Sequence, residues 1–349
     1  MRRRIQISAA EAMTPVGLTA AATAAAVRAK VNRVEANELY PSVDGDPLLV
    51  ATLPAADGAL DPLQRMLPAA VRSVDRLLES FETAFDAGRP CHLLLGTASE
   101  DRAGALCGSP ADSLPVALAQ RLAPRFGAPA VQVFTHGHAS AAFALDAAMG
   151  IVQRDPRSVC IVGAVDSLLD EELIEELEEE ERIAMAGAHP HGLCPSEAVA
   201  FLAIECERAP CPRPCLATVE AVATASEPHP YYDRVPTMAD GLALVCREAL
   251  REANVSPAQL DAVLLDMDGE HHRAHEWALV QSRCLAPADS YRLVHPADSY
   301  GSIGAASGVA MLALVSSARA WLDGTNLILM SDDEGPRGGV VLRRQHQGH

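Results

Sequence analysis

Two glycine-containing turns carry polar side chains at places where a strand-like run enters an apolar helix. Residues 135–150 read THGHASAAFALDAAMG, and His138 sits at the centre of the turn. Residues 301–304 read GSIG and offer the hydroxyl of Ser302. Partial positive charge gathers at the free N-terminus of a buried helix, so either turn could stabilise a nucleophile or an acyl oxyanion. The alternative is that small residues at these turns only allow the helices to pack closely.

His271, His272 and His275 form a second group of chemically active side chains. His271 and His275 would share one face of a helix because they lie at positions i and i+4, and Glu270 and Glu276 could add carboxylate ligands. A surface histidine cluster needs no metal, however, and we expect none here.

The nine cysteines are dispersed along the chain and odd in number, which indicates reduced thiols in a cytoplasmic protein. The segment CPRPC at 211–215 is not a metal-binding pair, because its prolines stiffen the spacing and no second pair follows. We therefore expect neither a metal nor a cofactor.

Composition limits the kind of protein further. The chain has 349 residues, 49% hydrophobic and 21% charged, so it can bury a large core as one large or two medium domains. Its net charge of −18 argues against nucleic-acid binding and is compatible with a basic protein partner. The start, MRRRIQIS, lacks the apolar stretch of a signal peptide, and no apolar run is long enough to span a bilayer. We expect no nucleic acid and no membrane as partners.

Strands alternate with helices in two successive series. The first places strands at 4–8, 92–96, 131–134, 159–165 and 198–205 and helices at 16–30 and 139–153. The second places strands at 216–224, 260–267, 327–331 and 339–343 and helices at 238–253 and 304–321. Unbroken apolar strands are typical of sheets buried on both faces. The pattern predicts a duplicated, layered α/β fold, with halves at 1–208 and 214–349.

Residues 170–181 are acidic except for an apolar stripe formed by Leu173, Ile174 and Leu177. This pattern is typical of a solvated surface helix. The alternative is a docking face for a basic partner, and an acidic carrier protein would not bind there.

Six segments, in order along nearly the whole chain, resemble the thiolase superfamily and specifically the β-ketoacyl-acyl-carrier-protein synthases. They are AMTPVG at 12–17, FTHGHASAAFAL at 134–145, CIVGAVDSLL at 160–169, GLCPSEAVAFLAIE at 192–205, NVSPAQLDAV at 254–263 and YGSIGAASG at 300–308. The resemblance implies the thiolase fold, in which two similar halves form a five-layer αβαβα sandwich. It also implies a dimer that buries the strand 131–134 across a two-fold axis.

The chain departs from this family at the catalytic positions. His138 stands where the family has its cysteine, Asp268 where it has the first histidine, and Ser302 where it has the second histidine or an asparagine. Condensation needs a thiolate to accept the acyl group and donors to stabilise an oxyanion. We therefore expect these site residues to be degenerate and condensing activity to be absent.

Three functions remain open. The first is a binding, scaffolding or adaptor protein, like a chain-length factor or an accessory of secreted effectors. It would form a homodimer, or a heterodimer with a related subunit, and its partner would be a ketosynthase or a secreted effector. The second is an acyltransferase or thioester hydrolase in which Asp268 orients His138 and His138 activates Ser302. The third is a variant acyltransferase whose mechanism the sequence does not reveal.

Overall fold

The computed structural model describes residues 4–42, 45, 47–54, 61–81, 86–99, 102, 113–185, 191–207, 213–285, 291–318 and 320–345. The proline-rich segment at 209–212 and the cysteine at 211 lie outside these residues. Among the described residues, no helix has the length and apolar character needed to cross a membrane.

The main sheet is built from two sets of strands with the same topology. The first half contains β1 (Ile5–Met13), β4 (Cys91–Gly96), β5 (Ala130–Phe134), β6 (Val159–Ser167) and β7 (Glu197–Cys206), in the spatial order β5-β4-β6-β7-β1. The second half contains β8 (Ala217–Ser226), β9 (Ala262–Leu265), β10 (Arg292–Val294), β11 (Gly324–Ser331) and β12 (Pro336–Arg344), in the order β10-β9-β11-β12-β8.

Strand directions repeat in the two halves as well. In the first half β4 pairs in parallel with β5 and β6, and β7 pairs antiparallel with β6 and β1. In the second half β9 pairs in parallel with β10 and β11, and β12 pairs antiparallel with β11 and β8. The halves meet where β1 pairs antiparallel with β8. Identical order and direction indicate an internal duplication.

The remaining elements are helices and one separate ribbon. The helices are α1 (Ala20–Arg28), α2 (Pro62–Glu79), α5 (Leu114–Phe126), α6 (Ser140–Arg154), α7 (Glu171–Glu179), α8 (Asp240–Ala253), α9 (His271–Val280), α10 (Ala297–Tyr300) and α11 (Ala306–Ser317). Short helical turns occupy Gly137–Ala139, Tyr231–Asp233, Pro257–Gln259 and Gln281–Leu285. The ribbon pairs β2 (Glu35–Pro41) with β3 (Pro47–Val50).

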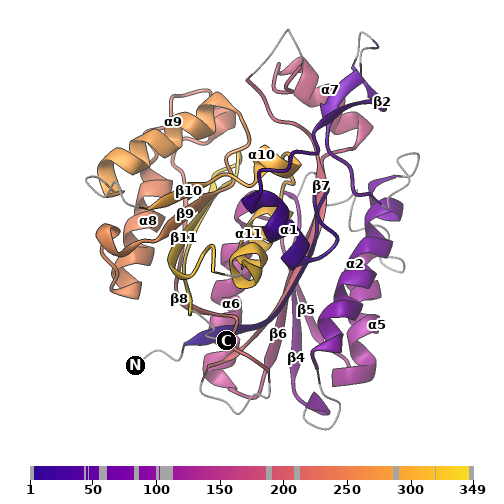
Figure 1. Ribbon diagram of the computed structural model, residues 1–349, viewed down its shortest axis with the longest axis vertical. Helices are drawn as coiled ribbons and strands as arrows, with labels where there is room; N and C mark the ends of the chain where they lie inside the picture. The colour runs from indigo at the N-terminus through magenta and orange to yellow at the C-terminus, as the bar shows by residue number, and fades with distance from the viewer. Residues whose placement is uncertain are drawn as a thin grey trace.

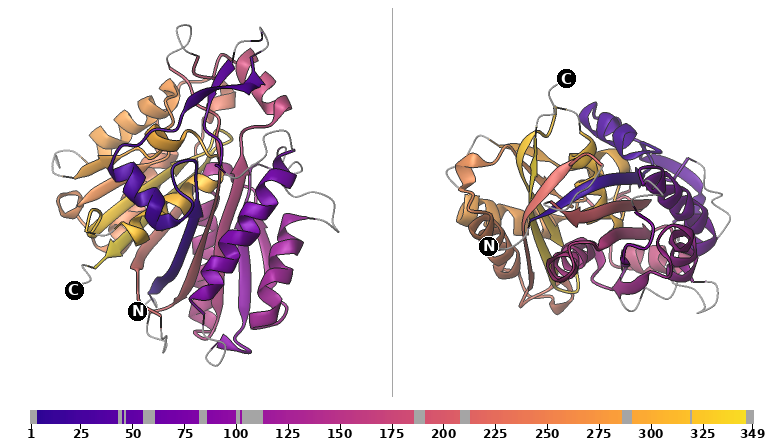
Figure 2. Two further views of the ribbon diagram at one scale, coloured as in Figure 1. Left: turned by 45° about the vertical axis from the view of Figure 1, so that its right-hand side comes forward. Right: turned by 90° about the horizontal axis from the view of Figure 1, so that it is seen from below.

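The helices and the two halves of the sheet form five layers (Figures 1 and 2). Helices α6 and α11 lie between the halves and share one core with strands of both. Helices α2 and α5 cover the outer face of the first half, and α8 and α9 cover that of the second. The αβαβα arrangement expected from the sequence is confirmed.

The composition of α11 explains its central position. Its residues from Ala306 to Ser316 are all buried, and a helix that is apolar all round belongs in the middle of a protein. It packs closely on α6, since a Cβ added to Gly308 would lie 2.5 Å from the Cβ of Ala141. The small residues of these helices therefore allow close packing, which was the alternative interpretation of the sequence.

Candidate functional site

The turn between β5 and α6 holds His138 in a fixed position. The Ser140 hydroxyl donates toward two backbone oxygens, those of Phe134 at 3.0 Å and Thr97 at 3.1 Å. The same hydroxyl oxygen accepts a hydrogen bond from the amide of His136 at 3.0 Å. This clamp ties the start of the helix to the ends of β4 and β5. His138 therefore lies at the N-terminus of the buried helix α6, and only 8% of the residue is exposed.

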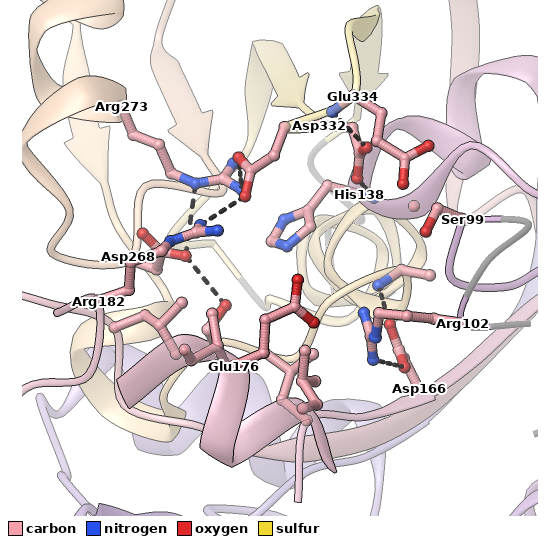
Figure 3. A pocket seen from close by; sticks show the side chains of 18 of the residues that line it. Ser99, Arg102, His138, Asp166, Glu176, Arg182, Asp268, Arg273, Asp332 and Glu334 are labelled. Carbon is pink, nitrogen blue, oxygen red and sulfur yellow. Dashed lines mark hydrogen bonds and ion pairs between the residues drawn. The ribbon is translucent and has the colours of Figure 1, made fainter. Parts of the chain in front are cut away.

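His138, Asp268 and Ser302 line the same cavity, which has a volume of about 370 Å³. The His138 ring projects into it, among charged side chains contributed by several elements (Figure 3). The charged residues of the lining are Arg102, Asp166, Glu176, Arg182, Asp268, Arg273, Asp332, Asp333 and Glu334. Leucine side chains supply the apolar part of the walls, at positions 168, 173, 177 and 193.

The carboxylate next to the His138 ring belongs to Asp266. Nδ1 of His138 lies 3.2 Å from Oδ2 of Asp266, although their angle does not make a hydrogen bond. Asp266 directly follows β9, and its Oδ2 accepts a hydrogen bond from the amide of Ser331 at 2.9 Å. Burial and the charge of Arg273 would lower the pKa of His138, but the carboxylates of Asp266 and Asp332 outweigh them and raise it.

Asp268 has a different neighbour from the one that the triad hypothesis requires. The Ser302 hydroxyl donates to Oδ2 of Asp268 at 3.0 Å, and Nε of Arg273 lies 3.4 Å from the same oxygen. Asp268 thus pairs with Ser302 and Arg273, whereas Asp266 takes the place beside His138. Sequence reasoning missed Asp266, although it is the first polar residue after the buried strand at 262–265.

Another carboxylate, that of Asp332, accepts a hydrogen bond from the backbone of the turn. The amide N–H of His138 donates to Oδ2 of Asp332 at 3.0 Å. Asp332 follows β11 and therefore reaches the turn from the second half of the protein. Gly137 has a φ of +49°, and a Cβ there would lie 1.8 Å from Oδ2 of Asp332. Only glycine fits at this position.

The second buried helix repeats this arrangement. The amide of Ala305 donates to Oδ2 of Asp166 at 2.7 Å, and Gly304 has a φ of +52°. A Cβ on Gly304 would lie 2.1 Å from the same carboxylate. Asp166 lies near the end of β6, the strand that corresponds to β11 in the repeated topology. Each helix N-terminus is therefore closed by an aspartate from the opposite half.

Two buried arginines organise the other wall of the cavity. Arg182 donates to both carboxylate oxygens of Glu270, at 2.7 and 2.9 Å, and to Asp333 at 2.5 Å. Arg273 donates to Asp333 at 3.0 Å. Burial alone would raise the pKa of Asp333, but Arg273, His272 and Arg182 hold it well below the usual value. These residues come from distant segments, so no local sequence pattern predicts their association.

Glu270, His272 and Asp333 are close enough to suggest a metal site, since their ligand atoms all lie within 4.8 Å of one another. Both carboxylates already pair with the guanidinium groups of Arg182 and Arg273. Two fixed cations beside the ligands oppose the binding of a third. The donor set therefore does not fit a metal ion.

No protein-family model matches the sequence, and no curated protein matches it either. Solved structures match the fold. A chain of the AntDE:AntF complex, a type II PKS acyl-carrier protein with its ketosynthase, superposes with a TM-score of 0.80 and 15% identity, over 99% of this chain and 100% of that one. The ishigamide ketosynthase/chain length factor gives 0.74 and 21%, over 98% and 99%. The oxazolomycin ketosynthase domain of Streptomyces albus gives 0.79 and 16%, over 99% and 76%.

These likenesses establish the fold. The chain has the thiolase-like ketosynthase fold over almost its full length, as the resemblance of its sequence segments implied. At this level of identity the likeness does not extend to function, because one fold can carry unrelated activities.

Proposed function

We propose that the protein is a non-condensing ketosynthase-fold protein that acts as a binding or scaffolding subunit, in the manner of a chain-length factor or an adaptor. The observation that carries the proposal is the hydrogen bond from the His138 amide to Asp332. A condensing enzyme needs free donors where negative charge develops, and here a carboxylate already occupies the donor at the helix N-terminus.

The side chain at the turn supports the same conclusion. An imidazole lacks the nucleophilicity of a thiolate, and an acyl-imidazole hydrolyses readily in water. Loss of a single oxyanion donor raises a barrier by about 3 kcal/mol. At this site the nucleophile is replaced, and Asp332 adds a negative charge that would repel an oxyanion. Both changes disfavour condensation.

The hydrolase alternative has weaker support. A serine triad would need His138 to accept the Ser302 proton, with a carboxylate holding the other ring nitrogen. The Ser302 hydroxyl donates to Asp268 instead. The His138–Asp266 pair could still activate a water molecule, but no described residue holds Ser302 as a nucleophile toward His138. We therefore retain hydrolysis as the second candidate only.

Assembly through β5 belongs to the same proposal. Among the described residues, β5 pairs only with β4, so its other edge is open. Val131 is 43% exposed and Val133 is 37% exposed along it. An open apolar edge is an aggregation hazard unless another strand covers it. We infer that a second copy or a related ketosynthase-like subunit pairs there. Six cysteines of the described residues are free thiols, which is compatible with a reducing compartment such as the cytoplasm; they are Cys91, Cys160, Cys194, Cys206, Cys246 and Cys284.

Incubation with acyl-carrier and acyl-CoA thioesters tests the proposed function. Intact mass spectrometry should show the unmodified protein at every time point, and thioester should not be consumed faster than in buffer. A condensing ketosynthase serves as the positive control. An acyl adduct on His138 or Ser302 would contradict the proposal, and catalytic loss of thioester without an adduct would favour the hydrolase.

A further inference from the structure

Helix α7 forms a wall of two separate cavities. Leu173, Glu176 and Leu177 face the candidate site. The other side of the helix faces a groove of about 640 Å³ between α7, the ribbon strand β2 and the start of α2, which lie together in Figure 1. Its lining includes Leu39 and Tyr40 of β2, Arg65 of α2, and Glu171, Ile174 and Glu175 of α7. Neither the proposed scaffolding role nor the hydrolase alternative uses this groove.

The charge of the groove is strongly negative. Asp61, Asp170, Glu171, Glu175 and Glu178 line it, and Arg65 is its one described cation. The Arg65 guanidinium is already engaged, because it donates to Glu197 at 2.7 Å and to Ser167 at 2.8 Å. Glu171 and Glu175 are exposed and lie one helical turn apart on α7. They therefore present a row of carboxylates that attracts cations.

The floor of the groove adds an apolar surface and a polar group without a partner. Leu39 is 63% exposed, whereas Leu169 and Ile174 are buried beneath it. Tyr40 is only 8% exposed, and its hydroxyl has no hydrogen-bond partner in the described part of the chain. Leaving a buried hydroxyl unpaired costs about 1–3 kcal/mol. The hydroxyl oxygen itself is covered, so a ligand of the groove would reach it only after the side chains above it shift.

We propose that this groove binds a basic segment of a partner protein, in which lysine or arginine side chains alternate with apolar ones. The cationic side chains would pair with Glu171 and Glu175, and the apolar ones would cover Leu39 and Ile174. Binding would shift the side chains that cover the Tyr40 hydroxyl, which would then bond to the segment's backbone. An acidic carrier protein is excluded from this face by like-charge repulsion. The groove is distinct from the β5 edge, so the inference does not depend on the dimer or on the loss of condensation.

A short fluorescein-labelled peptide of alternating lysine and leucine is the probe, with the glutamate–leucine peptide as its counterpart. Fluorescence anisotropy should detect the lysine peptide alone, with affinity that falls as salt is added. Glu171→Lys combined with Glu175→Lys should weaken binding about tenfold, as expected from two lost or reversed charge pairs. Tyr40→Phe should weaken it without lowering the melting temperature.

The matched control reverses two charges on the same helix outside the groove. Glu172 and Glu179 are exposed and line neither cavity. Glu172→Lys with Glu179→Lys alters the net charge by the same amount and should change binding less than about twofold, because exposed charges farther away are screened. Equal losses in the two double variants, or no binding of the lysine peptide by the unmodified protein, would overturn the proposal. Neither outcome bears on condensing activity, which the thioester assay tests separately.

Discussion

The amide of His138 and the carboxylate of Asp332 are joined by a hydrogen bond of 3.0 Å, although 194 positions separate them in the chain. This bond joins the turn before α6, in the first half, to the residue that follows β11, in the second half. The corresponding bond of the other half runs from the amide of Ala305 to the carboxylate of Asp166, so it joins the second half to the first. The bond from His138 also uses the donor that an oxyanion would need, so it bears on both stability and function.

Replacing Asp332 should therefore destabilise the protein. Asp332→Ala leaves the buried amide of His138 without an acceptor, which costs about 1–3 kcal/mol. Asp332→Asn retains an acceptor oxygen and should cost less than Asp332→Ala. Urea unfolding of the three proteins measures the difference. Equal stability of the alanine variant and the unmodified protein would show that the bond contributes nothing.

Gly137→Ala should destabilise the protein by at least about 1–2 kcal/mol, because the residue has a positive φ and its new Cβ would meet the Asp332 carboxylate. Gly304→Ala should behave alike because it would meet Asp166. Gly150 is the matched control, since it lies inside α6 and its added Cβ makes only an ordinary contact at 3.5 Å. Gly150→Ala should raise stability by about 0.4–1 kcal/mol. Similar unfolding midpoints for all three variants would contradict this account.

The raised pKa of His138 makes stability depend on pH. A group whose pKa is higher in the folded state adds stability below its unfolded value, near 6.5, and loses that contribution as pH rises through the folded value. The unmodified protein should therefore lose stability relative to His138→Gln as pH increases above about 6.5. Urea unfolding between weakly acidic and weakly alkaline pH tests this, and parallel curves for the two proteins would refute it.

The lowered pKa of Asp333 acts in the acidic range with the opposite sign. Its contribution is present above the unfolded value, near 3.9, and is lost as pH falls toward the folded value. Asp333→Asn should be less stable than the unmodified protein at neutral pH, and the gap should narrow as pH falls below about 4. Acid unfolding followed by circular dichroism measures this. A gap that stays constant would mean that the carboxylate does not ionise differently on folding.

The β5 edge should mediate a dimer. Light scattering at micromolar concentration should give twice the mass of the chain, and Val131→Lys with Val133→Lys should give the monomer, because charges on an edge strand prevent pairing. Val235 is 49% exposed outside β5, so Val235→Lys is the control and should leave the dimer intact. A monomeric unmodified protein would exclude a homodimer and leave only pairing with a related subunit.

The fold was largely predictable because its signals are local. Buried strands such as the one at 159–165 appear as unbroken apolar runs, and a helix such as 306–317 is apolar on all sides. The location of His138 at an elbow followed from the glycine and small residues around it. These patterns depend on residues that are close in sequence.

The partners within the site were harder to predict because they depend on register and on distant segments. Asp266 and Asp268 lie two residues apart, just after the short strand β9. Asp266 lies beside His138 and Asp268 accepts a hydrogen bond from Ser302, so an error of two residues in register assigns the wrong carboxylate to His138. The pairing of Arg182 with Glu270 joins segments 88 positions apart. No periodicity in the sequence encodes such a contact.

The most direct test of the central claim is a condensation assay of the His138→Cys variant with malonyl- and acyl-carrier thioesters. The claim is that this site cannot condense because both the nucleophile and its oxyanion donor are lost. A cysteine restores only the acyl acceptor, while Asp332 still occupies the amide and Ser302 still lacks the reach of an imidazole. We predict no condensation product, even if the new thiol becomes acylated. Product formation at a rate comparable to a condensing ketosynthase would contradict the account.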